Sequence, residues 1–538
     1  MALAKSTPIL CSPVGVTDVL DGTQAHPGSM SALSNLIHDP STQGVFYCRP
    51  AAIEQTTFAS FTTPGFVSAL LVIGSFAFGM IASGRNPGHD EPFCYNIAGG
   101  VFVPVSGVTS ANTPVSPSAT GDWEPPTLAL VGTKVLVTHP GFTGVGGAFF
   151  GWFDVTNPAA PSWSAGNTSP TALSVPPQGV AQFGNRAYFA VNNAVYYSDV
   201  LAPTTITNAS QILVIGDNVQ VTAMGPLGVY SAVQGGIVQA LILFKSVESM
   251  WQITGDAALS NLSLNALNVA TGTLAPNTVC PTTKGLAFVS PEGLRIIDAS
   301  ANVSDPIGAY GTGVAVPFIQ STVPSRMCAA FNGNVLRITT QNSGVIGQPQ
   351  QEWWCNMTLD NSWTGPHTFP ASLIDAYLGT FLMAPQGINA SLWMSDQVQN
   401  STSAFTENGV QMTWNWQTSF LPDNEVMSVN AVVETTIRMG FDSSIGTYSF
   451  YAIDQDGNVL DTVTNVAAGT QTIWGAFIWG AALWRGTAVP LQPQRIAWHI
   501  PIVFNTLAIR ATGASASSLK IGNLFMRYQV QSYMLRNT

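Results

Sequence analysis

The sequence predicts an all-β protein, with a β-propeller-like body of six or seven blades and a C-terminal β-sandwich-like domain. Charged residues make up only 8% of the 538 residues, whereas Gly (50) and Pro (35) are plentiful. Few Lys and Glu side chains disfavour long surface helices, and many β-branched and aromatic residues favour short strands joined by turns. The apolar runs also recur at a nearly constant spacing, which is typical of repeated blades.

The recurring unit is an apolar strand, a tight turn and a second strand, found between about residues 66 and 400. Successive units are 52, 55, 45, 45 and 45 residues apart, and they begin near Gly132, Gly184, Gln239, Lys284, Ala329 and Ile374. A propeller blade is a four-stranded sheet that buries its faces only against the next blade, and its repeat is about 40–50 residues long. With the segment 66–105 added, the pattern predicts six or seven blades.

The clearest local signal is a hairpin at the start of the stretch from Phe183 to Asp256. Two runs rich in aromatic and β-branched residues, 183–191 and 194–199, are separated by Asn192 and Asn193. Asn tolerates positive φ, and a two-residue turn of this kind joins strands with the correct twist. The stretch therefore predicts a tight hairpin followed by further strands.

The uncharged run Phe66–Ala82 approaches the length of a membrane-spanning helix. Gly74 and Ser75 divide it into two segments of strand length, and several of its residues are β-branched or aromatic. We therefore expect a buried hairpin and no transmembrane segment.

The remaining regions set the predicted domain boundaries. Residues 1–60 have no sustained period, so we expect an N-terminal arm or irregular layer, with one short helix over Ser29–Ile37. The propeller-like body then covers residues 61–400. Residues 401–538 contain alternating segments that predict a β-sandwich-like domain, interrupted by an apolar, Trp-rich insertion at 474–484.

Charge and cysteine content limit the classes of partner. A net charge of −11 and the lack of any basic run argue against stable nucleic-acid binding, which requires Lys and Arg to neutralise phosphates. So few charges also suggest that other subunits cover much of the surface. The cysteines lie far apart without metal-ligand spacing, so we expect buried free thiols at Cys11, Cys48, Cys94, Cys280, Cys328 and Cys355.

The charges are unevenly placed along the chain. Asp461 is the last acidic residue, so residues 1–461 carry −17 and residues 462–538 carry +6. We expect these later cations to pair with the acidic body of the same chain or of its neighbour.

Signals for catalysis are weak throughout the sequence. It contains no Gly-x-Ser-x-Gly elbow, no His-Glu-x-x-His and no Walker A loop. Asp122 and Glu124 flank Trp123, and paired carboxylates beside an aromatic ring could serve glycoside hydrolysis. They precede Pro125 and Pro126 in an expected loop, however, and the six histidines are dispersed. We therefore expect no catalytic residue, no metal site, no cofactor and no enzyme activity.

The order of the central segments resembles the tail nozzle, tail-hub and DNA-stabilisation proteins of short-tailed bacteriophages, a family that includes proteins like tail tubular protein B. In that family an Asn-Arg-aromatic hairpin ends in aromatic-Ser-Asp and is followed by a Gly-Asp strand, a Phe-Lys strand and a Trp-x-Ile-x-Gly-Asp strand. This sequence has matching segments in the same order at 185–189, 197–199, 215–217, 244–245 and 251–256. Weaker similarities at 46–50, 63–66, 447–450 and 504–510 extend the resemblance over most of the chain.

The resemblance implies a structural virion protein in the phage tail, assembled in the host cytoplasm. It further implies a homohexamer below the portal and adaptor proteins, near tail fibres or spikes. Such a ring extends and closes the DNA channel and passes the genome during ejection, with only transient contact to DNA. The family motifs are structural and imply no catalytic residue.

Two other functional classes remain open on the sequence alone. One is a propeller that binds glycans or hydrolyses glycosides as a receptor-binding protein, and the other is a β-rich capsid or fibre protein. The Trp-rich insertion departs from the family pattern. As a hypothesis, Trp474, Trp479 and Trp484 lie in a subunit or adaptor interface, where buried aromatic residues commonly dominate binding; packing inside the C-terminal domain is the alternative.

Overall fold

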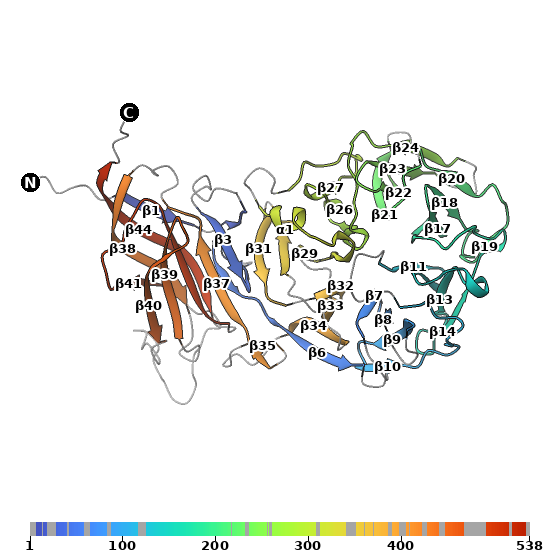
Figure 1. The fold of residues 1–538 in the computed structure, drawn as a ribbon, viewed down its shortest axis with the longest axis horizontal. Coiled ribbons are helices and arrows are strands. Elements are labelled where there is room, and N and C mark those ends of the chain that lie inside the picture. The colour runs from blue at the N-terminus through green and yellow to red at the C-terminus, as the bar shows by residue number, and fades with distance from the viewer. Residues whose placement is uncertain are drawn as a thin grey trace, which may run out of the picture.

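The computed structural model consists of a ring of small sheets joined side by side to a two-layered β-sandwich (Figure 1). It describes residues 7–12, 14–18, 28–39, 42, 44–58, 65–82, 88–116, 125–216, 218–231, 236–255, 257, 261–307, 313–340, 351–359, 361–369, 371–385, 390–397, 405–407, 409–421, 428–440, 447–466, 491–515 and 519–533.

The ring contains six four-stranded blades and one three-stranded sheet. The first three blades are β7 (Val67–Ile73), β8 (Phe76–Ile81), β9 (Glu91–Asn96) and β10 (Val101–Val103); β11 (Thr127–Val131), β12 (Lys134–Thr138), β13 (Phe150–Asp154) and β14 (Ser162–Gly166); and β16 (Gly179–Phe183), β17 (Arg186–Val191), β18 (Ala194–Tyr197) and β20 (Ile212–Val214). The next are β21 (Ala223–Ser231), β22 (Gly236–Lys245), β23 (Ser249–Thr254) and β24 (Ser263–Ala266), and the three-stranded sheet β25 (Cys280–Thr282), β26 (Gly285–Ser290) and β27 (Gly293–Ile297). The last two are β28 (Cys328–Asn332), β29 (Val335–Thr340), β30 (Gln351–Asn356) and β31 (Ser362–His367), and β32 (Ala371–Tyr377), β33 (Thr380–Pro385) and β34 (Ser391–Gln397) with β6 (Ala51–Thr57).

The sheets form a ring because the first strand of each packs beside the first strand of the next, through β7, β11, β16, β21, β25, β28 and β32 and back to β7. Aromatic side chains fill the spaces between blades. Phe78 contacts Phe153 with ring centroids 5.3 Å apart, and Phe150 contacts Phe189 at 4.9 Å. Each blade thus buries its faces against its neighbours, and the predicted propeller of six or seven blades is confirmed.

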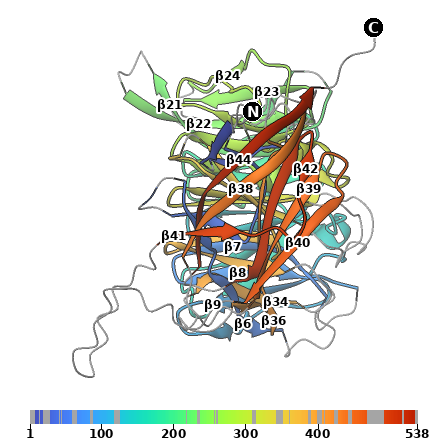
Figure 2. The same cartoon turned by 90° about the vertical axis from the view of Figure 1, so that its left-hand side faces the viewer.

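The sandwich consists of two layers whose strands pair antiparallel, except for the parallel pair of β2 and β3. One layer contains β4 (Leu36–His38), β5 (Phe46–Cys48), β44 (Lys520–Tyr533), β38 (Ser428–Gly440) and β41 (Gln492–Ile496), with β1 (Thr7–Cys11) on β44 and β42 (Val503–Phe504) on β38. The other contains β3 (Ser29–Ser34), β37 (Thr413–Thr418), β43 (Leu507–Ala514), β39 (Thr447–Asp454) and β40 (Val459–Val466), with β2 (Gly15–Val16) on β3. Figure 2 shows β38, β44 and β41 side by side at the end of the molecule opposite the propeller.

Short elements connect these sheets. Two strand pairs stand apart, β15 (Ser169–Pro170) with β19 (Thr205–Ile206) and β35 (Thr406–Glu407) with β36 (Val410–Gln411). The described helices are single turns: η2 (Val145–Gly147), η4 (Pro276–Thr278), α1 (Val316–Ile319) and η5 (Pro324–Arg326). None of the helices in the described part of the chain has the length and apolar character needed to cross a membrane.

Two hairpin predictions are confirmed. Val67–Ile73 and Phe76–Ile81 pair antiparallel across the Gly74–Ser75 turn, so the uncharged run 66–82 forms strands of the first blade. Arg186–Val191 pairs with Ala194–Tyr197, and Asn192 has the positive φ of 54° that the turn requires.

The N-terminal region differs from the prediction. Residues 29–37 form β3 and the start of β4, so the predicted short helix is wrong. Instead of an irregular layer, the described part of residues 1–60 contributes six strands to the sheets. Five of these strands belong to the sandwich layers, and β6 forms the outer strand of the last blade. Local sequence favoured a helix here, but pairing and burial against distant strands decided the conformation.

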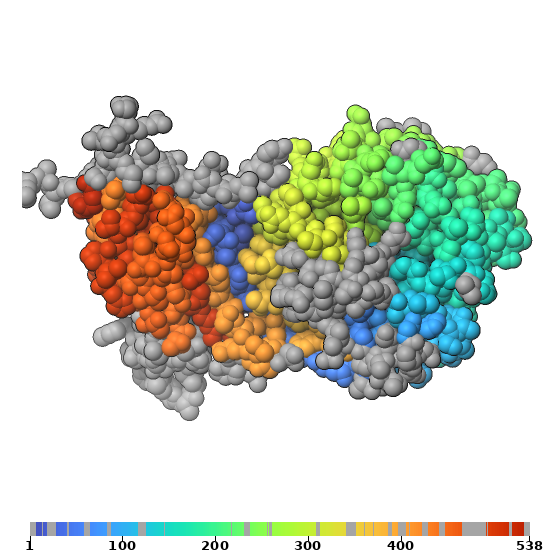
Figure 3. All heavy atoms as spheres, viewed as in Figure 1, coloured from blue at the N-terminus to red at the C-terminus, as the bar shows by residue number. Residues whose placement is uncertain are grey.

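The N-terminal strands join the two parts of the molecule. β3 pairs with β37 of the sandwich along most of its length and also bridges to β31 of a propeller blade at Leu33 and Gly365. One sheet therefore runs from β28 in the propeller to β40 in the sandwich. In Figure 3 the blue N-terminal residues lie between the orange and red sandwich and the yellow blade.

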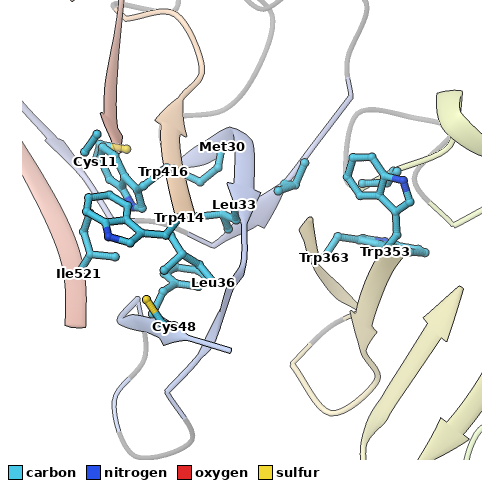
Figure 4. Packing of buried hydrophobic residues seen from close by; sticks show 14 of the residues in the cluster. Cys11, Met30, Leu33, Leu36, Cys48, Trp353, Trp363, Trp414, Trp416 and Ile521 are labelled. Carbon is cyan, nitrogen blue, oxygen red and sulfur yellow. The ribbon is translucent and has the colours of Figure 1, made fainter. Parts of the chain in front are cut away.

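The largest hydrophobic core spans this boundary. It includes Trp414 and Trp416 of β37, Leu33 of β3, and Trp353 and Trp363 of the adjoining blade. Figure 4 shows Trp414 and Trp416 on one side of Leu33, and Trp353 and Trp363 on the other. Because both parts bury apolar surface in one cluster, separating them would expose large aromatic side chains to water.

A buried polar network holds the same boundary. Arg49, only 3% exposed at its side chain, donates to both carboxylate oxygens of Glu407 at 2.7 and 2.9 Å and to Asn35 Oδ1 at 2.8 Å. Glu407 Oε1 also accepts from the backbone N–H of Ala52, the second residue of β6. The amide of Asn35 donates to Thr413 O at 2.7 Å, which ties the network to β37. A paired, hydrogen-bonded guanidinium is the form in which a buried charge is tolerated.

Removing Glu407 should therefore destabilise the whole molecule. In a Glu407→Ala variant the buried Arg49 guanidinium loses its counter-ion, which typically costs about 3–5 kcal/mol. The free energy of unfolding from urea titration measures this loss. The matched control is Glu54→Ala on the exposed side of β6, which should change stability by less than about 0.5 kcal/mol. Equal effects of the two substitutions would contradict the assigned role of Glu407.

The boundary should also respond to acid. Burial lowers the pKa of His38 from 6.5 to about 4, and burial together with the nearby Arg49 and Arg337 charges lowers that of His367 well below 6.5. A depressed histidine pKa means that the folded state prefers the neutral ring. This stability is fully present above pH 6.5 and is lost progressively as the pH falls towards 4.

A His38→Gln variant should accordingly lose less stability than the wild type between pH 7 and pH 4. Urea unfolding at several pH values measures the difference. His89→Gln, at a partly exposed histidine in the propeller, is the control. A His38→Gln variant with the same pH dependence as the wild type would argue against a buried neutral His38.

Candidate functional site

The centre of the ring encloses a cavity of about 210 Å³. Its walls come from the first strands of the blades and consist mainly of small or apolar residues, including Ala69, Val180, Ala223 and Ala329. Asp375 of β32 is the one charged residue among the described lining residues. Drug-sized ligand pockets are usually about 300–1,000 Å³, so this cavity is small for an organic ligand.

Asp375 closes the ring where the last blade meets the first. Its Oδ2 accepts a hydrogen bond from the backbone N–H of Val72 at 2.6 Å, and its Oδ1 accepts one from Ala376 N–H at 2.8 Å. Burial raises the pKa of Asp375 to about 6, while these two hydrogen bonds act in the opposite direction. The carboxylate therefore links β32 to β7, and both of its oxygens already have partners.

The described wall of this cavity does not provide the carboxylate pair of a glycosidase site. Glycoside hydrolysis uses two carboxyl groups about 5–9.5 Å apart across the scissile bond. The described cavity wall supplies only Asp375. The carboxylate pair considered in the sequence, Asp122 and Glu124, lies outside the described residues. Trp123, which separates the two, also lies outside them.

Ser68, Asp90 and His139 form a buried trio that the sequence analysis missed. Asp90 Oδ2 accepts from Ser68 Oγ at 2.8 Å and lies 2.7 Å from His139 Nε2. The backbone N–H of Gly141 donates to His139 Nδ1 at 2.9 Å, so Nε2 carries the ring proton. A catalytic histidine must accept the proton of its serine, whereas here both side chains bind the aspartate. The trio links the first two blades, and its hydrogen bonds differ from those of a Ser-His-Asp triad.

Residues of the family-like motifs meet between the third and fourth blades. The Lys245 ammonium is fully buried and donates to Ile215 O at 2.6 Å. Gly216, with φ of 54°, faces the Trp251 ring so closely that a Cβ would lie 2.7 Å from Cζ2. Three motif segments thus share one structural junction, which joins the hairpin that carries Lys245 and Trp251 to Ile215 and Gly216, about 30 residues earlier in the sequence. Asp217 and Asp256, the acidic ends of two motifs, lie outside the described residues.

The hairpin motif has a similar structural role. Arg186 Nη1 donates to Ser198 O at 2.7 Å, and Ser198 Oγ accepts from Ala187 N–H at 2.9 Å. Asp199 Oδ1 accepts from the Gln211 amide at 3.0 Å, and Thr207 donates to Oδ2. These bonds fix the end of the hairpin and the loop after it.

The thiols also fit the prediction of buried free cysteines, since all six are buried and unpaired with one another. Burial raises the pKa of Cys94, Cys280 and Cys328 to about 12, so these thiols stay protonated at neutral pH. Within the described ranges, no three or more His, Cys, Asp or Glu side chains gather in a way that could hold a metal ion. The interface candidates Trp474, Trp479 and Trp484 lie outside those ranges, so their role stays a prediction.

The raised pKa of Asp375 gives a testable pH effect. The pKa of this carboxyl group is about 6 in the folded protein, against an ordinary value of 3.8. Its contribution to folding stability is therefore fully present below pH 3.8 and is lost as the pH rises through 6. The wild type should therefore gain stability relative to Asp375→Asn as the pH falls from 7 to 4, as measured by urea unfolding. A difference that does not vary with pH would contradict a desolvated carboxyl group at this position.

Comparisons with known proteins identify no family. No family model matches the sequence, and no curated protein matches it either. Among solved structures, the WD40 β-propeller domain of Doa1 aligns over 65% of this chain and 98% of its own, with 9% identity and a TM-score of 0.38. The exo-β-1,3-galactanase of Phanerochaete chrysosporium, solved with galactose, covers 97% of this chain and 100% of its own at 7% identity and a TM-score of 0.23. The SapL1 lectin in complex with α-methyl fucoside covers 57% and 97% at 11% identity and a TM-score of 0.31. TM-scores this low support no argument about function. The propeller fold is established by the pairing of the strands themselves.

Proposed function

We propose that this chain is a structural protein of a bacteriophage virion, a tail nozzle or hub that lines and closes the DNA channel of a short tail. The observation that carries the proposal is the ordered series of motif segments between residues 185 and 256. Lys245, Ile215, Gly216 and Trp251 come from three of these segments and meet in one inter-blade junction. A shared structural junction explains why these residue types would occur together in a family without a common active site.

The proposed channel lies between copies of the chain. The cavity inside one propeller measures about 210 Å³, which is far too small for a duplex whose major groove alone is about 12 Å wide. DNA would therefore pass through the axis of a ring of copies, for which we propose six. With few Lys and Arg residues and a net charge of −11 on each copy, such a wall would make few phosphate contacts and let DNA slide.

The proposed position is below the portal and adaptor proteins, with tail fibres or spikes attached outside. The scarcity of charged residues, 8% of the chain, supports extensive coverage by such neighbours. The Trp-rich insertion 474–484 is the proposed additional contact to a subunit or to the adaptor. No catalytic step is part of this function.

Electron microscopy of the purified full-length chain, with and without the purified adaptor ring, tests the proposal. We expect rings of six with an axial opening, and a mass near six times 56.7 kDa by mass photometry. A chain that stays monomeric even with the adaptor and binds glycans on an array would overturn the proposal in favour of a receptor-binding propeller. Trimers or filaments would instead favour a fibre or capsid protein.

A further inference from the structure

The outer face of the first sandwich layer carries arginines on adjacent strands. In the register of β38 and β41, Arg495 lies opposite Thr436 and Arg438 lies opposite Pro493. Residues two apart on a strand share a face, so Arg438 and Arg495 are diagonal neighbours about 7–8 Å apart. The alternate residues Ile437, Met439 and Ile496 are buried, which places both arginines on the solvent side.

A third arginine extends this face onto β44. Arg527 lies opposite Glu434, and the two side chains are 3.8 Å apart. Lys520, on the same strand, is neutralised by Asp39 at 2.6 Å. We call the exposed Arg438 and Arg495, together with the partly exposed Arg527, the basic face.

Two members of the basic face have no ionic partner in the described part of the chain. The side chains of Arg438 and Arg495 are exposed and make no ion pair or hydrogen bond with described residues. Like charges held as neighbours on a sheet destabilise it slightly, so the arrangement has no benefit within one chain. A partner with negative charge would remove the repulsion.

The same chain supplies such negative charge. Residues 1–461 carry a net −17. Exposed carboxylates without an ion pair in the described part of the chain include Glu54 on β6, Glu248 on the turn after β22, and Asp305 after β27. All three belong to propeller strands or to the segments next to them, whereas the basic face lies on the sandwich (Figure 1).

We propose that the basic face docks on an acidic surface of the propeller of a second copy of this chain. A contact of this kind joins two different patches and is therefore head-to-tail, an arrangement that forms a cyclic ring when the rotation between copies closes. A contact between two identical basic faces would place like charges against each other. The inference shares self-association with the proposed function, but that function does not specify which surfaces meet.

Duplex DNA is the less favoured partner for this face. Three arginines on a chain of net charge −11 offer few phosphate contacts against a general repulsion. A complementary acidic protein surface needs only these few cations, because rim charges mainly set orientation and association rate.

The test is the self-association of the full-length Arg438→Glu/Arg495→Glu variant, measured by mass photometry and analytical ultracentrifugation from low to high salt. We expect its dissociation constant to rise about tenfold or more, and its salt dependence to weaken, because like charges would then face the acidic surface. Arg438→Lys/Arg495→Lys keeps the charge and should assemble like the wild type. For the single substitution Arg495→Glu, the matched control is Lys284→Glu, an exposed cation on the propeller.

Each result separates this inference from the proposed function. The wild type could form rings whose affinity and salt response do not change on double charge reversal. That result would overturn docking through the basic face but leave the nozzle proposal standing. A wild type that is monomeric at every salt concentration, alone and with the adaptor, would overturn both. The wild type could instead bind a short DNA duplex, and the double reversal could abolish that binding without changing self-association. That result would identify DNA as the partner and overturn docking between copies. Unchanged thermal unfolding by circular dichroism shows that the variants are folded.

Discussion

The buried ion pair between Arg49 and Glu407 is the interaction on which the arrangement of the two parts depends. An arginine side chain that is 3% exposed is tolerated only when its donors are paired, and here the partners are Glu407, Asn35 and a backbone carbonyl. Arg49 lies between the strands that enter the sandwich and the strand that completes the last blade. Its pairing therefore fixes where the chain leaves one part and joins the other.

This path makes the N-terminal strands structural elements of both parts. β6 completes the last blade, so the ring is closed by a strand that precedes the whole propeller in the sequence. β3 continues a propeller sheet into the sandwich, and one hydrophobic core includes both sides.

The local features were predictable from the sequence because they depend on neighbouring residues. Turn residues such as Asn192 and Gly74 mark hairpins, and the spacing of apolar runs marks blades. The N-terminal strands were not predictable, because β1 pairs with β44 more than 500 residues away and carries no period of its own. For the same reason the trio of Ser68, Asp90 and His139 was invisible in the sequence, since the three side chains meet only after two blades pack together.

The positions of the charges were also only partly predictable from the sequence. The excess of cations after Asp461 was clear from composition, and Lys520 does pair within the chain, with Asp39. That Arg438 joins Arg495 on one face depends on the register of β38 and β41, which a sequence does not contain. The carboxylate pair Asp122 and Glu124 had a local pattern in the sequence, and it lies outside the described residues, so its role is not tested.

Native-state hydrogen exchange most directly tests the central claim that the N-terminal strands hold propeller and sandwich as one body. Backbone amides of β3 and β6 that are hydrogen-bonded should exchange only through global unfolding, together with those of β37 and β33. Exchange of β3 and β6 by local release, while the two flanking sheets stay protected, would contradict the account.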